Sequence, residues 1–275
     1  MNTDLHSRPV RHLPPITPPA PPRPRRWRWA ALGLVAVVAV AGFGVWWFVF
    51  RGEPPAPANL DQALAGVSAP AATVPAATVA GDAPATTAAP VASAVEGTWS
   101  IDRTITNAQG TGSYTGFRVN EVLTGIGSST AVGRTSTVEG TLTVKGTTLT
   151  AATIDARLSA LATDDSRRDS AVQRALDTSR FPNATFVLTQ PVDVGSVPVE
   201  GQRITAAATG DLTIHGVTRQ VTLDLQAQLQ NGVLVVVGST DVRFSDYGVT
   251  APTAPVVASV DDHGVVEVQL YFVKR

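Results

Sequence analysis

The chain has 275 residues, a formal net charge of −1 at pH 7 and no cysteine. The absence of cysteine excludes a disulfide framework, a thiolate nucleophile and a zinc site that uses sulfur ligands. The net charge conceals an uneven distribution, because residues 1–51 carry seven arginines against a single acidic residue, Asp4. We therefore divide the chain into parts before interpreting any of them.

Residues 1–28 are expected to form a disordered, basic, proline-rich tail. The run LPPITPPAPPRP at residues 13–24 suits neither a helix nor a sheet, because proline lacks the amide donor and fixes φ. We expect a solvated cytoplasmic segment, with a PxxP ligand for a partner protein as the alternative.

Residues 29–50, WAALGLVAVVAVAGFGVWWFVF, predict a single transmembrane helix. The run holds no charge, and its length matches a hydrocarbon core of about 30 Å. Tryptophans bracket it, and the arginine cluster lies on its amino-terminal side. We therefore expect a single-pass protein of the cell membrane, with a cytoplasmic amino terminus and an extracytoplasmic carboxyl-terminal domain. A signal cleaved near Ala58 is the alternative, although the apolar run exceeds the roughly 7–15 residues usual for a signal.

Residues 51–94 are expected to be a disordered linker. They are mostly alanine, proline, threonine, valine and glycine, without a periodic apolar face and with little charge. We expect this linker to hold the following domain away from the membrane.

Residues 95–275 predict one mainly β domain. Apolar and polar residues alternate between turn residues, which is typical of strands with one buried face. In VVEVQLYFV, residues 265–273, the inward set is Val266, Val268, Leu270 and Phe272, and the outward set is Glu267, Gln269 and Tyr271.

One helix is expected to interrupt the strands, within DDSRRDSAVQRALDTSRFP at residues 164–182. Asp164 or Asp165 can cap it, and Pro182 marks its end. Between these limits, Val172, Ala175 and Leu176 recur at helical spacing.

The predicted fold is an antiparallel, lipocalin-like β-barrel with one inserted α-helix, preceded by the transmembrane helix. Closure hides the strand edges, and a barrel of about eight strands can be filled by its own side chains or hold one slender ligand. The candidate ligand-binding residues of the interior are Trp99, Ile101, Phe117, Val119, Leu142, Val144, Ile154, Leu158, Phe186, Leu188, Leu212, Ile214, Arg219, Val221, Leu223, Phe244, Val268 and Leu270.

Four blocks of the sequence, in this order and spacing, resemble the YceI-like domain family. They are GTWSID at residues 97–102, RRDSAVQRALDTSRFPNATF at 167–186, GDLTIHGVTRQVTL at 210–223 and DYGVTAP at 246–252. The resemblance covers about residues 99–273. The run YTGFRVNEVLTGIGSSTAVGRT at residues 114–135 also resembles the membrane-anchored actinobacterial members of the family. The resemblance implies a lipocalin-like barrel that binds a polyisoprenoid or another long-chain lipid. Many members carry a histidine in the second strand, where this chain has Asn120 and Glu121, so no histidine role is carried over.

The block GDLTIHGVTRQVTL is interpreted mainly as a hairpin. His215 and Gly216 lie at its bend, where glycine accepts a positive φ. Arg219 falls on the inward face of the second strand, where a charge is costly unless it is paired or exposed to solvent. We expect an ion pair with Asp246 or Asp169, and a contact with a ligand head group is the alternative.

The residues do not combine into a catalytic or metal-binding pattern. The histidines are His6, His12, His215 and His263, which are dispersed, and no G-x-S-x-G elbow occurs. We expect neither enzyme activity nor a cofactor. The arginines next to the membrane attract anionic lipid and do not imply a nucleic-acid partner.

We expect a membrane-tethered binding protein that holds a polyisoprenoid or a similar long-chain lipid in its barrel. The alternative is a structural or interaction domain of the cell envelope, with a packed barrel and no ligand. A hydrolase is a third reading, which would require turnover that depends on His215.

Overall fold

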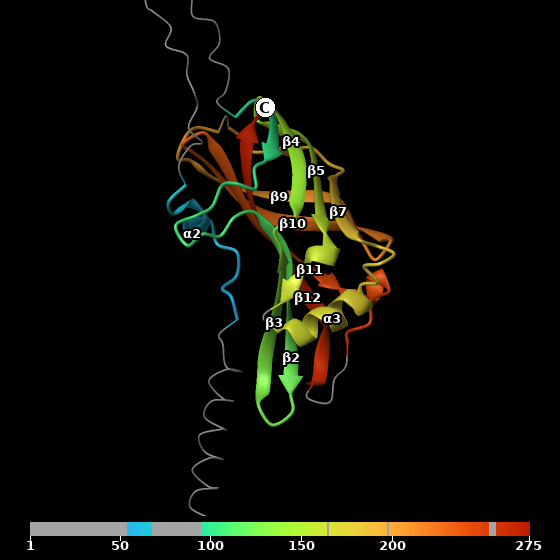
Figure 1. Ribbon diagram of the computed structural model, residues 1–275. Helices are drawn as coiled ribbons and strands as arrows, with labels where there is room; N and C mark the ends of the chain where they lie inside the picture. The colour runs from blue at the N-terminus through green and yellow to red at the C-terminus, as the bar shows by residue number, and fades with distance from the viewer. Residues whose placement is uncertain (1–53, 68–94, 164, 197, 253–256) are drawn as a thin grey trace, which may run out of the picture. The chain divides into compact units, whose positions relative to one another are not determined.

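The computed structural model describes residues 54–67, 95–163, 165–196, 198–252 and 257–275 (Figure 1). The described helices are α2 (Leu60–Leu64) and α3 (Ser166–Ala175), and η1 (Leu158–Ala160) and η2 (Phe244–Tyr247) are 3-10 turns. The strands are β1 (Gly97–Ile101), β2 (Tyr114–Leu123), β3 (Gly127–Thr135), β4 (Val138–Lys145), β5 (Thr148–Arg157), β6 (Ala162–Thr163), β7 (Asn183–Leu188), β8 (Val192–Asp193), β9 (Arg203–Ile214), β10 (Val217–Gln230), β11 (Val233–Arg243) and β12 (Val257–Lys274).

The predicted tail at residues 1–28 and the predicted span at 29–50 lie outside the described residues, as does linker segment 68–94. Within the described ranges, no helix is both long enough and apolar enough to cross a membrane.

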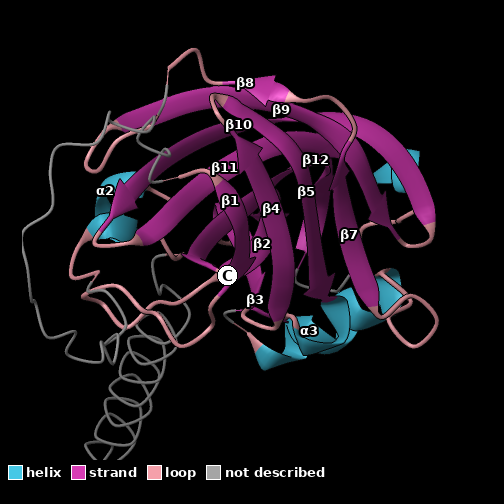
Figure 2. Ribbon diagram, turned by 90° about the horizontal axis from the view of Figure 1, so that it is seen from above, coloured by secondary structure: helices cyan, strands magenta, loops and turns pink. Residues whose placement is uncertain are grey.

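The strands form the predicted antiparallel barrel. Eight of them close in the order β1, β4, β5, β7, β9, β10, β11 and β12, and β12 pairs back onto β1 (Figure 2). The alternation of the sequence explains the wall, because inward positions on neighbouring strands meet in register. Leu142 of β4 lies opposite Trp99 of β1 and Ala152 of β5, for example.

Strand β12 divides one of its edges between two partners. Its carboxyl-terminal end pairs with β1 through Ile101 and Phe272, whereas most of its remaining length pairs with β2. Strands β2, β3 and β6 therefore extend the sheet beyond the closed ring. The barrel is closed by β1 at one end, and its wall continues into β2 and β3 toward the other.

Helix α3 confirms the predicted interruption of the strands. The carbonyl of Asp165 accepts the amides of Arg168 and Asp169 at 2.8 and 3.2 Å, which starts the helix. The chain leaves the helix through Asp177, whose φ is 43°, and Pro182 follows shortly after. Figure 2 shows α3 lying across the ends of β5 and β7.

Residues 54–67, which we call the strap, pack against the outer wall of the barrel. Asn59 caps α2 by accepting the amides of Asp61 and Gln62 at 2.9 and 3.2 Å. The apolar residues of the strap join outward-facing residues of β11 and β12 in one buried cluster: Leu60, Ala63, Leu64, Val67, Ile105, Val233, Val235, Val237 and Tyr271. The prediction of a disordered linker is therefore wrong for residues 54–67.

A buried carboxylate fastens the strap to the wall. Glu267 of β12 is 1% exposed and lies 2.7 Å from Arg134 Nη2 and 3.9 Å from Arg118 Nη1. Its Oε2 also accepts the amide of Ala58 at 3.2 Å. The two arginines donate to the strap carbonyls of Pro55 and Ala56, at 2.6 and 2.5 Å. Glu267, Arg118 and Arg134 therefore interact with one another and also bind the backbone of the strap.

In a half-buried strand the outward residues face solvent. Gln269 and Tyr271 of β12 do not, because the strap and its neighbours cover them. Gln269 is 4% exposed, and Tyr271 is fully buried. The Tyr271 hydroxyl donates to the carbonyl of Ala63 in α2 at 2.9 Å, and burial raises the pKa of this tyrosine. The prediction of the two faces is confirmed, but both faces of β12 are covered from Glu267 to Phe272.

The ion cluster predicts the effect of Glu267→Gln. The amide keeps the shape of the side chain but removes the negative charge beside two partly buried arginines. We expect the free energy of unfolding to fall by about 3 kcal/mol, and amides of the strap to exchange faster with deuterium. Urea unfolding and hydrogen exchange of the full chain measure both effects.

The matched control is Glu139→Gln, which removes an exposed carboxylate from β4. It should change the free energy of unfolding by less than about 0.5 kcal/mol. Equal stability of the two variants would contradict the role of the ion cluster.

Candidate functional site

The candidate site is the inner wall of the barrel. The strand register and the apolar clusters place the predicted interior residues on the inward side, including Leu158 and Phe244 in the 3-10 turns at the strand ends. Alternation along a strand shows which face of the wall a residue lies on, but not its position along the barrel axis. The structure separates these residues into a packed floor, a middle section and the opposite end, which we call the mouth.

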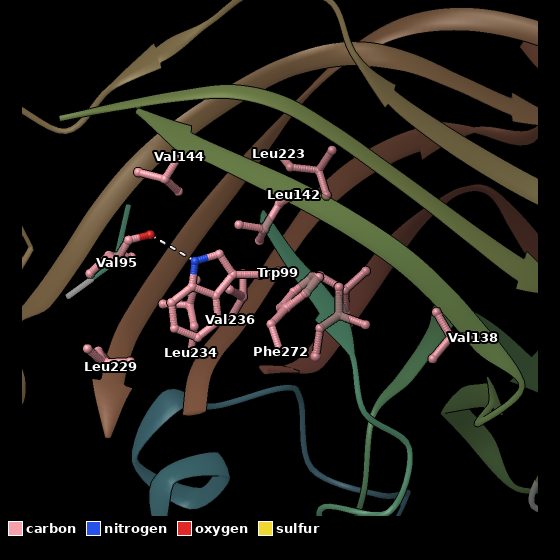
Figure 3. Packing of buried hydrophobic residues seen from close by; sticks show 12 residues of the cluster. Val95, Trp99, Val138, Leu142, Val144, Leu223, Leu229, Leu234, Val236 and Phe272 are labelled. Atoms are coloured by element: carbon pink, nitrogen blue, oxygen red, sulfur yellow. Dashed lines mark hydrogen bonds between the residues drawn. The ribbon is translucent and has the colours of Figure 1, made fainter. Parts of the chain in front are cut away.

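The floor is built around Trp99. Its indole is 1% exposed, and Nε1 donates to the carbonyl of Val95 at 2.8 Å (Figure 3). Predicted residues that are buried in this cluster are Trp99, Leu142, Val144, Leu223, Val268 and Leu270, and Val138, Leu229, Leu234, Val236 and Phe272 complete it together with Val95. Because these side chains are covered by one another, this end of the barrel is filled.

The middle section is less tightly covered. Ile101, Ile154, Phe186 and Val221 pack against the floor but keep partial exposure. Ile154 and Phe186 lie opposite each other on adjacent strands of the ring and point inward. This partial exposure indicates open space beside these inward side chains. We infer a lumen above the floor.

Several inward glycines increase the room in this lumen. A Cβ at Gly210 would lie 2.4 Å from the ring of Phe186, and one at Gly133 would lie 2.5 Å from the ring of Phe117. A Cβ at Gly264 would likewise lie 2.4 Å from the ring of Phe244. Each aromatic ring therefore leans over a glycine of a neighbouring strand. The rings lie along the wall because no side chain occupies the space beneath them.

The mouth is covered partly by α3. Its residues Val172, Ala175 and Leu176 pack into the apolar clusters of this end together with the predicted residues Phe117, Leu158, Leu212, Ile214 and Phe244. The side-chain amide of Gln173 donates to the carbonyls of Leu158 and Leu161 at 2.9 and 3.1 Å. These bonds hold the helix to η1, beside the lumen. Of the remaining predicted residues, Val119 is buried on β2, and Leu188 is half-buried opposite Gly210.

Sequence analysis missed an ion pair at this end. Glu121 shares the inward face of β2 and is 5% exposed, and it lies 2.7 Å from Arg168 Nη2 of α3. Asn120, its neighbour, is exposed on the outer face. At the position where many relatives were expected to carry a histidine, this chain therefore ties β2 to α3 through a carboxylate. The alternation of β2 indicates the direction of Glu121 but not its partner.

The expected ion pair of Arg219 is not formed. Its Nη1 donates to the carbonyl of Thr218 at 3.1 Å, and none of the described carboxylates lies within ion-pair distance of it. Asp169 instead accepts the amide and hydroxyl of Thr163, at 2.6 and 2.7 Å. Arg219 does lie on the inward face, opposite Leu212, as predicted, but its side chain is exposed at the mouth. Exposure to water removes the need for a paired carboxylate.

His215 is part of the turn, as predicted. It adopts a φ of 53°, and Gly216 adopts 74°. The Nδ1 atom of His215 lies 3.1 Å from the carbonyl of Tyr247, and its ring centroid is 5.1 Å from that of Phe181. These contacts join the hairpin to η2 and to the chain after α3.

A second hollow, of about 540 Å³, lies on the outer wall beside the strap. Its lining includes Arg118, Asp224, Asp241, His263 and Glu267, which point away from the lumen. This hollow therefore carries charged side chains that the inner wall, apart from Glu121 and Arg219, does not. Among the residues described, no group of three or more histidine or acidic side chains is placed to hold a metal ion.

The fold defines a lipocalin-like barrel with an apolar inner wall and a filled floor. The YceI-like domain family matches residues 99–272, and the chain belongs to this family. Two curated relatives, called UPF0312 protein, come from Pseudomonas putida strains F1 and KT2440. Each is 39% identical over 72 residues, which are 26% of this chain and 34% of the relative. The chain thus matches about a third of the length of these relatives.

Two solved structures are similar in fold. A polyisoprenoid binding domain from Saccharophagus degradans has a TM-score of 0.51 and 18% identity, with coverage of 64% of this chain and 98% of that one. BcnA of Burkholderia cenocepacia has a TM-score of 0.45 and 17% identity, with coverage of 62% and 98%. At 18% identity, the likeness to the Saccharophagus degradans domain concerns the fold alone.

Proposed function

We propose that the barrel binds one long apolar lipid chain, an isoprenoid or a similar lipid, in the lumen above the Trp99 floor. The observation that carries this proposal is the partial exposure of inward apolar side chains, notably Ile154 and Phe186, inside a closed wall. Burial of each methylene contributes about 0.8 kcal/mol, so a long chain needs few polar contacts to bind. The domain from Saccharophagus degradans, which shares the fold, is described as polyisoprenoid binding, and this supports the ligand class.

The competing function is a structural or interaction domain whose barrel is packed throughout. The filled floor agrees with either function. The middle section distinguishes them, because a packed barrel has no room for an additional large side chain there, whereas a lumen does.

The substitution Val221→Trp tests the two functions. Val221 is half-buried, points inward and contacts both the floor cluster and the cluster at the mouth. In a hollow barrel the indole fills the lumen, so we expect binding of geranylgeraniol to weaken at least tenfold with little loss of stability. In a packed barrel the same change would cost about 1–3 kcal/mol of stability.

The matched control is Gln220→Trp, which places the indole on the outer face of the same strand. Calorimetric titration and thermal unfolding of the full chain give both quantities. Two results would contradict a ligand in the lumen. One is that the Val221→Trp variant binds geranylgeraniol as tightly as the control, and the other is that it loses about 1–3 kcal/mol of stability, as an overpacked core would.

We also propose that residues 29–50 anchor the chain in the cytoplasmic membrane and that the barrel lies outside the cytoplasm. The support is the uncharged run and the arginines on its amino-terminal side.

Protease added to intact cells, with the wall opened where necessary, tests the orientation. The barrel should be digested once it is destabilised by Glu267→Gln, whereas an epitope in the arginine-rich tail should survive until the membrane is lysed. An epitope that is lost before lysis, with a protected barrel, would show the opposite orientation.

A further inference from the structure

The mouth of the barrel carries a cation on its inward face. Arg219 lies on β10 opposite Leu212 of β9, and Leu212 is buried in the apolar cluster of the mouth. Its guanidinium makes one hydrogen bond, to the neighbouring carbonyl of Thr218. Most of its donors are therefore available to a ligand, since no described carboxylate pairs with it.

A buried hydroxyl lies in the same part of the barrel. Tyr247 is 3% exposed, belongs to the same cluster as Leu212, and its hydroxyl has no hydrogen-bond partner within the described structure. A buried hydroxyl without a partner is unfavourable, so a ligand that accepts its hydrogen bond gains affinity. The contact of His215 Nδ1 with the Tyr247 carbonyl, at 3.1 Å, fixes this residue beside the hairpin that carries Arg219.

The two groups are electrostatic neighbours. Burial raises the pKa of Tyr247, the positive charge of Arg219 lowers it, and the negative charge of Asp246 raises it. Asp246 is exposed and is not paired with Arg219. The local charge thus consists of one cation on the inward face and one carboxylate on the adjoining turn.

An apolar path connects this position with the floor. Val221 follows Arg219 by two residues on the inward face of β10, and Phe186 of β7 lies across β9 from Arg219. Both side chains contact the mouth cluster and the floor cluster. A chain held in the lumen would therefore place its polar end near Arg219 and its apolar end above Trp99.

We propose that Arg219 and the Tyr247 hydroxyl form a head-group site for a lipid with an anionic end, a phosphate or a carboxylate. This inference rests on the proposed binding of a lipid chain in the lumen. Arg219 would donate charge-assisted hydrogen bonds to the anion, and Tyr247 would donate a further one. The site would select the lipid by its charge, whereas the lumen selects it by its apolar length.

Three probes with the same prenyl chain test the site in the full chain: geranylgeraniol, geranylgeranyl monophosphate and geranylgeranoic acid. We expect the wild type to bind at least one of the anionic probes more tightly than the alcohol. The tighter of the two anions identifies the head-group class. Arg219→Met should weaken binding of that anion at least tenfold, or about 1.4 kcal/mol, and change binding of the alcohol less than twofold.

Three further variants separate the site from general effects. Arg157→Met removes an exposed arginine from the outer face of β5 and should leave every affinity unchanged. Asp246→Asn should tighten binding of the anion two- to threefold. Tyr247→Phe should raise the melting temperature of the ligand-free protein and weaken binding of the anionic probe severalfold.

The outcomes distinguish this inference from the function on which it rests. A wild type that binds none of the probes would contradict lipid binding itself. Binding of the alcohol with no preference for either anion would contradict only the head-group site, and so would equal losses for all probes in Arg219→Met. Unchanged affinities in Tyr247→Phe would remove the hydroxyl from the site.

Discussion

The barrel depends on the way β12 divides its pairing. One edge of this strand pairs with β11, and the other is shared between β2 and β1. Pairing with β1 closes the ring beside Trp99, where inward side chains can meet and form the floor. Pairing with β2 carries the wall outward, so the other end needs α3 to cover it. The closed floor and the partly covered mouth both follow from this single strand.

The carboxyl-terminal part of β12 is covered on both faces. Its inward side chains belong to the floor and the lumen, and its outward face carries Glu267 under the strap. Two neighbouring strands supply the arginines that neutralise this carboxylate and hold the strap carbonyls. The outer wall therefore acquires a second small core, which makes residues 54–67 part of the barrel domain rather than a spacer in front of it.

The inner wall combines large side chains with glycines in a way that has a functional consequence. If Phe186 and Phe244 pointed to the centre, they would help to fill a barrel of eight strands. Inward glycines at positions 210 and 264 leave space for these rings beside the wall. The inner wall is therefore an apolar surface, and the proposed ligand would lie against it with Arg219 at the mouth as the nearby cation.

Alternation in the sequence was sufficient to predict the strands, their inward faces and the inserted helix, because a period of two or of 3.6 residues follows directly from which face is buried. It could not separate the floor from the lumen, since parity does not encode depth along the barrel. The strap was missed although Leu60, Ala63, Leu64 and Val67 follow helical spacing, because five helical residues give too short a pattern within an alanine-rich run. Arg219 lacks an ion pair because its side chain is exposed at the mouth, and alternation along β10 indicates its face but not this exposure.

The central claim is that the barrel holds one lipid chain above the Trp99 floor. Native mass spectrometry of the full chain, released from detergent after incubation with polyprenyl lipids and followed by lipid extraction, tests it most directly. We predict a complex of one lipid per chain, with the lipid recovered in the extract. A protein that remains free of ligand under these conditions, whichever polyprenyl lipid is supplied, would contradict the account.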